Sequence, residues 1–236
     1  MSENIKKIKK AFKVDLDSSK NQNIILKPSA RSFNNQAYQV NEVPAKIAEK
    51  IYNLIKDAKH PNDDTILNHN KIKEAFFSPF EPQLKDAQVF LSHSHADKNK
   101  ALKVKNYLES ETNHRVFIDS LFWDYKDDVL NELSEYDKTS KIKDAFTLIL
   151  RESLQNMIEK CPYFVFLESK NSVSNQGLSC ITYSAWIYEE LKIAHSIRES
   201  RPTPMMESWQ VFHDISPFLE SLETITLKEL SRIINS

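Results

Sequence analysis

Apolar positions in the second half of the chain follow two different periods. Short continuous apolar runs predict buried strands, and these runs cover residues 88–92, 115–119 and 162–167. Elsewhere apolar residues recur every three or four positions, which predicts helices over residues 98–110, 142–158 and 184–198. Strands that alternate with helices indicate parallel strands joined by crossovers. The pattern therefore predicts an α/β fold with a central parallel sheet flanked by helices.

The first 80 residues have a different pattern. Residues 1–40 are polar, with only short apolar runs, and predict a loosely ordered arm or an extended cover. Apolar residues at helical spacing predict a helix over residues 43–58 and a short one over residues 71–77, before prolines that predict a linker. We expect a mainly helical or irregular N-terminal extension over residues 1–82 and the α/β domain over residues 83–236.

Glycine is nearly absent from the chain. Average usage of roughly 7% would give about 16 glycines, whereas the 236 residues contain one, Gly177. A dinucleotide fingerprint and a phosphate-binding P-loop each need several glycines. The composition therefore excludes both devices.

Charge is balanced overall but unevenly distributed. The net charge is −1, which predicts neither a nucleic-acid nor a membrane partner. Residues 1–80 carry 14 basic and 9 acidic side chains (+5), and the remainder carries 18 and 24 (−6). Several N-terminal lysines supply the excess: Lys6, Lys7, Lys9, Lys10 and Lys13. They indicate either a solvated terminus or a phosphate-binding arm.

The start of the chain does not suggest secretion. The N-terminus lacks the apolar run of a signal peptide, and no stretch approaches the 18 apolar residues of a membrane span. The two cysteines, Cys161 and Cys180, have no zinc-binding spacing. We expect a cytoplasmic protein with reduced thiols.

The helix over residues 184–198 carries an unusual carboxylate. On a helical wheel Glu190 falls near the middle of the apolar arc, whereas Glu189 falls toward its polar edge. A carboxylate among apolar neighbours is expensive unless it is paired or opens into a cleft, and its pKa tends to be raised. Glu190 is therefore a candidate functional residue; the alternative is a structural glutamate bonded to a buried backbone group or an arginine. Trp186 precedes it by one turn and is either a ligand platform or a core residue.

Polar segments follow each predicted strand, over residues 92–97, 119–123 and 168–174. Ligands of parallel sheets bind beyond the carboxyl ends of the strands. The first segment contains His93, His95 and a carboxylate, which leaves three interpretations open: a metal site, a polar ligand-binding loop or a helix-capping turn. The chain lacks the G-x-S-x-G elbow of serine hydrolases.

Four motifs in order resemble bacterial TIR (Toll/interleukin receptor) domains. Residues 89–98 resemble their first strand and its Ser-His-Ser…Asp-Lys loop, and residues 116–119 and 163–169 resemble their second and third strands. Residues 184–191 match their Ser-x-Trp-x-x-x-Glu-Leu signature. The resemblance covers roughly residues 86–200 and is closer to stand-alone bacterial TIR proteins than to receptors or adaptors.

This resemblance implies a flavodoxin-like TIR fold and an enzyme that cleaves NAD⁺ as substrate, without a further cofactor or metal. It implies that Glu190 is the catalytic residue. The residues expected to line the substrate pocket are Ser92, His93, Ser94, Asp119, Ser120, Trp123, Ser184 and Trp186.

By the same resemblance, the implied activity is that of an NAD⁺ glycohydrolase or cyclase in bacterial antiphage immunity. The product would be ADP-ribose or a cyclic signalling form of it, sensed by a downstream effector, and the TIR domain would self-associate. Two alternatives remain: a non-catalytic TIR interaction module, and an enzyme similar to nucleoside deoxyribosyltransferases.

Two features depart from the family pattern. Residues 120–125 replace the Gly-Pro loop that usually follows the second strand, and a long insertion of weak pattern precedes the helix at residue 142. A fourth and a fifth strand are hard to find, since only residues 210–212 offer a weak candidate.

Overall fold

The computed structural model describes residues 10–26, 43–57, 69–79, 86–136, 140–176, 179–199 and 213–236. The strands are β1 (Lys10–Asp15), β2 (Ala87–Ser92), β3 (Arg115–Ile118), β4 (Tyr163–Glu168), β5 (Ser174–Gln176), β6 (Ser179–Thr182), β7 (His213–Asp214) and β8 (Glu223–Thr224). The helices are α1 (Ser19–Ile25), α2 (Val43–Asp57), α3 (His69–Phe77), the 3-10 turn η1 (His95–Asp97), α5 (Lys98–Thr112), α6 (Asp119–Tyr136), α7 (Ser140–Lys160), α8 (Ala185–Glu199), α9 (Ser216–Glu220) and α10 (Leu227–Ile234).

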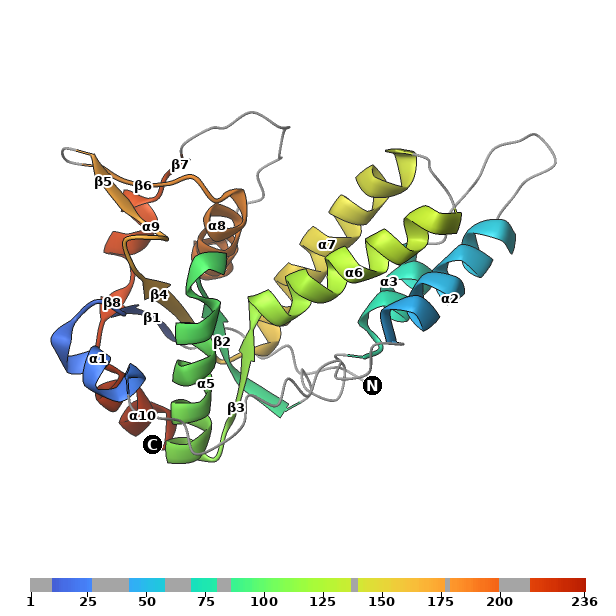
Figure 1. Cartoon of the computed structure of the whole chain (residues 1–236). Coiled ribbons are helices and arrows are strands. Elements are labelled where there is room, and N and C mark those ends of the chain that lie inside the picture. The colour runs from blue at the N-terminus through green and yellow to red at the C-terminus, as the bar shows by residue number, and fades with distance from the viewer. Residues whose placement is uncertain are drawn as a thin grey trace. The chain divides into compact units, whose positions relative to one another are not determined.

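A parallel sheet lies at the centre of the fold. Within the described residues it has five strands in the order β3-β2-β4-β1-β8 (Figure 1). Numbered along the chain, the five strands lie in the order 3-2-4-1-5, which differs from the flavodoxin-like order 2-1-3-4-5 because β1, the first strand of the chain, takes the fourth place in the sheet. The predicted α/β fold, with a parallel sheet flanked by helices, is confirmed.

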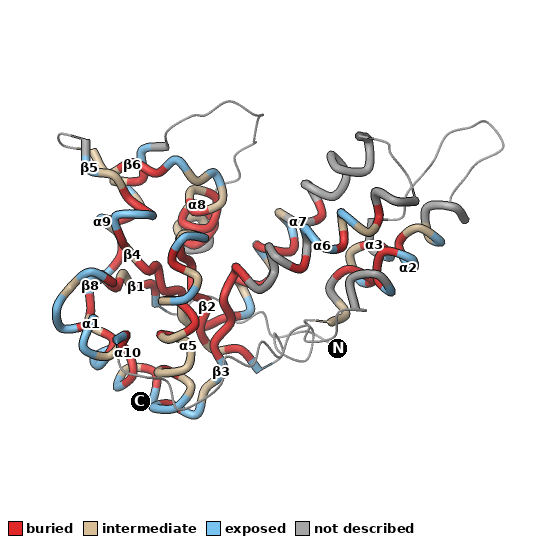
Figure 2. Tube along the Cα trace, viewed as in Figure 1, coloured by how far each residue is buried: buried red, intermediate tan, exposed pale blue. Residues whose placement is uncertain are grey.

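Aromatic residues of neighbouring strands form the core of this sheet. Figure 2 shows these strands as largely buried, and Phe90 of β2 stacks against Phe164 of β4 and Phe117 of β3, with ring centroids 5.9 and 5.8 Å apart. Helix α5 covers the sheet beside α1 and α10, which both contact it. These contacts explain why the short apolar runs form strands, since a strand covered on both faces is apolar throughout.

The expectation of an N-terminal arm is wrong for residues 10–26. Strand β1 pairs with β4 along its whole length, and Phe12 and Val14 have no exposed surface. The intervening Lys13 obscured this alternation in the sequence; its ammonium forms an ion pair with Glu168 at 3.2 Å. Strand β1 thus supplies one of the two strands that the sequence did not reveal.

The fifth strand, β8, is too short to have a recognisable pattern. It comprises two exposed residues that pair with β1, and Ile225 just after it donates its backbone N–H to the Lys13 carbonyl at 3.0 Å. Residues 210–212, the weak candidate, lie outside the described residues. A second, antiparallel sheet in the order β5-β6-β7 was not predicted.

The chain divides into two compact units. The first comprises the described parts of residues 1–33, 86–120 and 155–236 and contains both sheets. The second comprises the described parts of residues 34–85 and 121–154, which are helical. The predicted N-terminal extension is thus divided between the two units. The insertion that precedes the predicted helix at residue 142 lies in the same unit as the predicted helices at 43–58 and 71–77.

The second unit has its own core. Tyr125 of α6 packs edge-on against Phe76 of α3, with ring centroids 5.2 Å apart, and donates its hydroxyl to the Phe76 carbonyl at 3.1 Å. The insertion, whose pattern in the sequence is weak, forms a helix, in which Tyr125, Val129 and Leu133 are buried at four-residue spacing. None of the helices in the described ranges is long and apolar enough to span a membrane.

Candidate active site

Strands β2 and β3 bring two polar segments to one edge of the sheet. Leu91 lies opposite Ile118 in the parallel register, so the chain leaves both strands at the same level. Ser92 ends β2, and Asp119 begins α6 directly after β3. Strand β2 has β3 on one side and β4 on the other, so this edge is the point where the strand order reverses. Ligands of open α/β sheets bind at such a point.

Helix α8 places Glu190 against this edge. The Ser92 hydroxyl donates a hydrogen bond of 2.5 Å to Glu190 Oε2, and Glu190 has no exposed surface. The predicted position of Glu190 on the apolar face of its helix is confirmed, since Ile187, Leu191 and Ala194 of the same face are also buried.

The surroundings of Glu190 favour its protonated form. Burial raises the pKa of Glu190, and the charge of Asp119 and a hydrogen bond with Asp119 raise it further; the hydrogen bond from Ser92 opposes them. The result is a pKa well above the usual range. In its ionised form, Glu190 Oε1 has no donor among the described residues. Among the described residues, the Glu190 carboxylate is bonded neither to a backbone group nor to an arginine, which was the structural alternative.

His93 and Asp119 form a buried pair beside Glu190. Their Nδ1 and Oδ1 atoms are 2.5 Å apart, and both side chains are buried. Burial alone would lower the pKa of His93, but the charge of Asp119 and the hydrogen bond to it raise the pKa above its usual value. The His93 Nε2 and Ser120 Oγ atoms are buried without a hydrogen-bond partner among the described residues.

The edge thus collects five buried polar side chains: Ser92, His93, Asp119, Ser120 and Glu190. All five were predicted as site residues from the sequence. Unpartnered buried polar atoms cost free energy and are rare in folded proteins, which makes this edge the candidate ligand site. Because these side chains are buried, a ligand reaches them only after neighbouring groups move.

No family model, curated protein or solved structure matches the chain.

The other predicted site residues lie in different positions. Ser184 immediately precedes α8, and its Oγ accepts a hydrogen bond of 3.3 Å from the Ile187 backbone N–H, which is a helix-capping role. Ser94 is half-buried before η1 and makes no capping hydrogen bond to that turn. Trp186 is half-buried one turn before Glu190. The side chain of Trp123 lies outside the described residues.

Glu189 is not at the polar edge of its helix, as the wheel predicted, but is 1% exposed. Lys192, one turn further along α8, approaches Glu189 Oε1 to 3.5 Å and also lies over the Tyr188 ring at 5.5 Å. A lysine that covers a glutamate can bury it without leaving its charge unpaired, and a helical wheel does not reveal such cover.

The loop after β2 is fixed by Asp97. Its carboxylate accepts hydrogen bonds from Ser169 Oγ at 2.5 Å and Asn171 Nδ2 at 3.0 Å, and Lys100 Nζ lies 3.3 Å away. Asp97 thus ties this loop to the one after β4 and holds the site edge together. As for the metal interpretation, the described residues contain no group of three or more His, Cys, Asp or Glu side chains that could bind a metal ion.

Removal of this carboxylate should weaken the fold. We expect Asp97→Ala to lower the free energy of unfolding by about 2–3 kcal/mol, because the buried Ser169 hydroxyl, the Asn171 amide and Lys100 lose their acceptor. The measurement is urea denaturation. The matched control is Asp86→Ala, since Asp86 is exposed at the start of β2; it should change the same quantity by less than about 0.5 kcal/mol. Equal effects of the two variants would contradict the role given to Asp97.

Proposed function

We propose that this protein cleaves the nicotinamide–ribose bond of NAD⁺ as a glycohydrolase or cyclase. The observation that carries the proposal is the Glu190 carboxyl, fully buried beside Asp119 at the edge where the strand order reverses. The resemblance of four motifs to TIR domains supports NAD⁺ as the substrate, because it assigns the catalytic role to the same glutamate.

The reaction needs one carboxylate that is ionised when the bond breaks. The bond between the ribose anomeric carbon and the pyridinium nitrogen breaks, and its electron pair neutralises the departing nicotinamide. No acid is therefore needed for the leaving group, unlike the two-carboxylate chemistry of ordinary glycosidases. Positive charge develops on the ribose, and the Glu190 carboxylate would stabilise it. Water then gives ADP-ribose and a proton, whereas attack by a group of the nucleotide itself gives a cyclic product.

The neighbours of Glu190 have distinct proposed roles. Ser92 holds Oε2 through its hydrogen bond, which leaves Oε1 to accept a ribose hydroxyl. Asp119 favours the charged form of His93, in which Nε2 can donate to an acceptor atom of the substrate, as can the Ser120 hydroxyl. In this proposal Trp186 flanks the nicotinamide or the ribose, and Ser94 contributes to the pocket.

Access to the buried site would couple activity to assembly. Self-association is part of the proposal, because contacts between copies could shift the groups that now cover Glu190. Catalytic rate per molecule should then rise with protein concentration. The product would serve as a signal for a downstream effector in antiphage immunity.

A transferase similar to nucleoside deoxyribosyltransferases is the second candidate, because a buried glutamate held by a serine could also attack a nucleoside as the nucleophile. A non-catalytic interaction module is less well supported, since a scaffold gains nothing from unpartnered polar atoms in its core.

The test is a substrate panel analysed by mass spectrometry. The full chain is incubated with NAD⁺, and in parallel with a deoxynucleoside plus a free purine base. Release of nicotinamide from NAD⁺ alone supports the proposal, and the mass of the co-product separates linear from cyclic ADP-ribose. Base exchange in the nucleoside without nicotinamide release would favour the transferase instead.

The pH dependence of the reaction should respond to Asp119. We expect kcat/KM of the wild type to rise with pH above the ordinary glutamate range, because Glu190 must lose its proton and its pKa is raised. Asp119→Asn removes the negative charge beside Glu190, so kcat/KM should begin to rise at a lower pH. Burial of Glu190 still keeps this pH above the ordinary pKa of a glutamate. The measurement is kcat/KM of both proteins between about pH 4 and 9. Asp86→Asn is the control, and a limb that stays in place in Asp119→Asn would contradict this coupling.

A further inference from the structure

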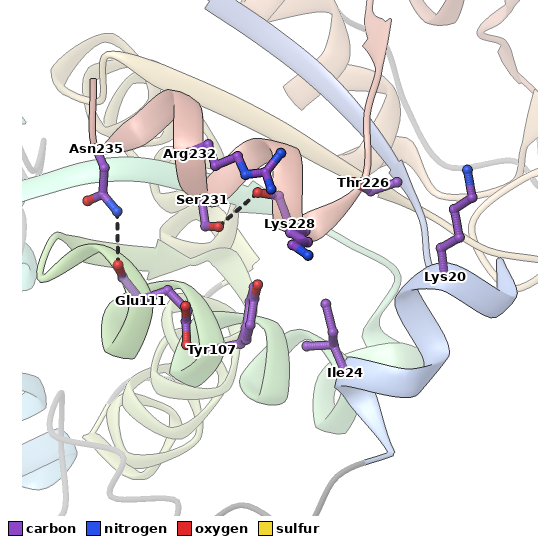
Figure 3. Close-up of a pocket in the computed structure, with 9 residues that line it drawn as sticks. All are labelled: Lys20, Ile24, Tyr107, Glu111, Thr226, Lys228, Ser231, Arg232 and Asn235. Carbon is purple, nitrogen blue, oxygen red and sulfur yellow. Dashed lines mark hydrogen bonds between the residues drawn. The ribbon is translucent and has the colours of Figure 1, made fainter.

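A groove with unpaired cations lies between α1, α5 and α10, apart from the residues of the candidate active site. Its volume is about 680 Å³, and its lining residues are Lys20, Ile24, Tyr107, Glu111, Thr226, Lys228, Ser231, Arg232 and Asn235 (Figure 3). Cofactor and ligand sites generally have volumes of about 300–1,000 Å³. The groove is therefore large enough for a nucleotide.

The walls of the groove are held together by specific contacts. The Leu227 backbone N–H of α10 donates to Asn21 Oδ1 of α1 at 3.0 Å, and Asn21 is buried. At the other end of α10, Asn235 Nδ2 donates to the Glu111 carbonyl of α5 at 2.9 Å. All three helices belong to the first unit, so the groove is a feature of one folded body.

Three cations of the groove have no ion-pair partner within the described part of the chain: Lys20, Lys228 and Arg232. The acid Glu229 of α10 is already engaged, because its carboxylate accepts from the Thr226 backbone N–H and hydroxyl, each at 2.8 Å, in the capping box of α10. These hydrogen bonds lower the pKa of Glu229, and the charges of Lys20 and Arg232 lower it further.

Opposite the cations, the groove presents an aromatic and an apolar side chain. Figure 3 shows Lys228 extending from α10 toward Tyr107 of α5 and Ile24 of α1, with Glu111 at the far end. A phosphate group would satisfy Lys228 and Arg232, since guanidinium and ammonium groups bind phosphate oxygens strongly. A flat base would stack on the Tyr107 ring.

We propose that this groove is a second ligand site, which binds a nucleotide with a diphosphate group. Lys228 and Arg232 bind the phosphates, Lys20 adds charge at one end, and Tyr107 carries the base. The site does not depend on the proposed activity, because it shares no residue with the cluster around Glu190.

The test is calorimetric titration of the full chain with ADP and with inorganic pyrophosphate. We expect ADP to bind with a dissociation constant below about 1 mM, and Lys228→Gln/Arg232→Gln to weaken that binding at least about tenfold, as loss of a charged hydrogen bond does. Tyr107→Ala should weaken ADP about fivefold or more while leaving pyrophosphate unchanged, since stacking contributes only to the base. Thermal melts confirm that the variants fold.

Two controls separate this groove from other sites. Lys103 lies on α5 outside the groove lining, and the variant Lys103→Gln should bind ADP like the wild type. Glu190→Gln should also bind ADP unchanged, so failure of the proposed NAD⁺ chemistry leaves this result intact. The proposal is overturned if millimolar ADP does not bind, if the double variant binds it equally well, or if Glu190→Gln abolishes binding.

Discussion

Replacement of Glu190 by glutamine should reduce the rate of NAD⁺ cleavage by about 10³-fold or more, because the neutral amide cannot stabilise the positive charge that develops on the ribose. The side chain is nearly isosteric and can still accept the Ser92 hydroxyl, so the geometry around it is retained. The measurement is kcat for nicotinamide release. KM should change much less than kcat, since the lost interaction belongs to the transition state.

The matched control is Glu189→Gln, the same chemical change one position earlier on α8. Glu189 is also buried but is covered by Lys192, and we place it outside the reacting groups. Its kcat should stay within a few-fold of the wild type. A comparable loss in both variants would mean that general disturbance of α8, and not the Glu190 carboxylate, limits the reaction.

Stability separates loss of chemistry from loss of fold. The pKa of Glu190 is higher in the folded protein than in the unfolded chain. The free energy of unfolding of the wild type therefore declines as the pH rises from the ordinary glutamate pKa to the raised pKa of the folded state. Glutamine does not ionise, so the stability of Glu190→Gln should not show this decline. We therefore expect the variant to melt at or above the wild-type temperature at neutral pH, with a gain of up to about 2 kcal/mol. A lower melting temperature would contradict the assigned burial cost.

Phe12→Ala should lower the free energy of unfolding of the sheet-containing unit by about 3–5 kcal/mol, the usual cost of removing a buried phenylalanine. Phe12 has no exposed surface and stacks on Tyr163 of β4, with ring centroids 6.5 Å apart. Strand β1 lies between β4 and β8, so a cavity here also weakens the pairing on both sides. The measurement is urea denaturation monitored by circular dichroism.

The control for this prediction is Lys10→Ala in the same strand, where the side chain is exposed. It should change stability by less than about 0.5 kcal/mol. If Phe12→Ala were as mild as Lys10→Ala, β1 would be the peripheral arm that the polar N-terminus suggested, and not a strand of the central sheet.

The sequence predicted those elements whose apolar pattern is long or uninterrupted. Strand β4 has four consecutive residues with no exposed surface, Phe164 to Leu167, and this is the signal of a strand covered on both faces. Strand β1 lacked that signal because Lys13 interrupts it, and the stem of a lysine can lie in a sheet while its ammonium reaches Glu168. Strand β8 has only two residues, and its conformation is decided by pairing with residues 211 positions earlier in the chain.

The candidate site was predictable where backbone topology alone determines position. Ser92, His93 and Asp119 follow strands, and parallel strands bring such residues to one edge. Side-chain partners are decided in three dimensions, so the sequence did not predict that Lys192 covers Glu189 or that Asp97 binds Ser169. Ser184 carried the family signature but serves as a helix cap, which its position before α8 could equally have indicated.

The central claim is that the buried Glu190 carboxylate cleaves the nicotinamide–ribose bond. Its most direct test is quantitation of free nicotinamide after incubation of the full chain with NAD⁺, wild type and Glu190→Gln side by side, at low and at high protein concentration. We expect nicotinamide from the wild type, with more per molecule at high concentration, and none above background from the variant. Equal release by both proteins, or no release by the wild type at either concentration, would contradict the claim.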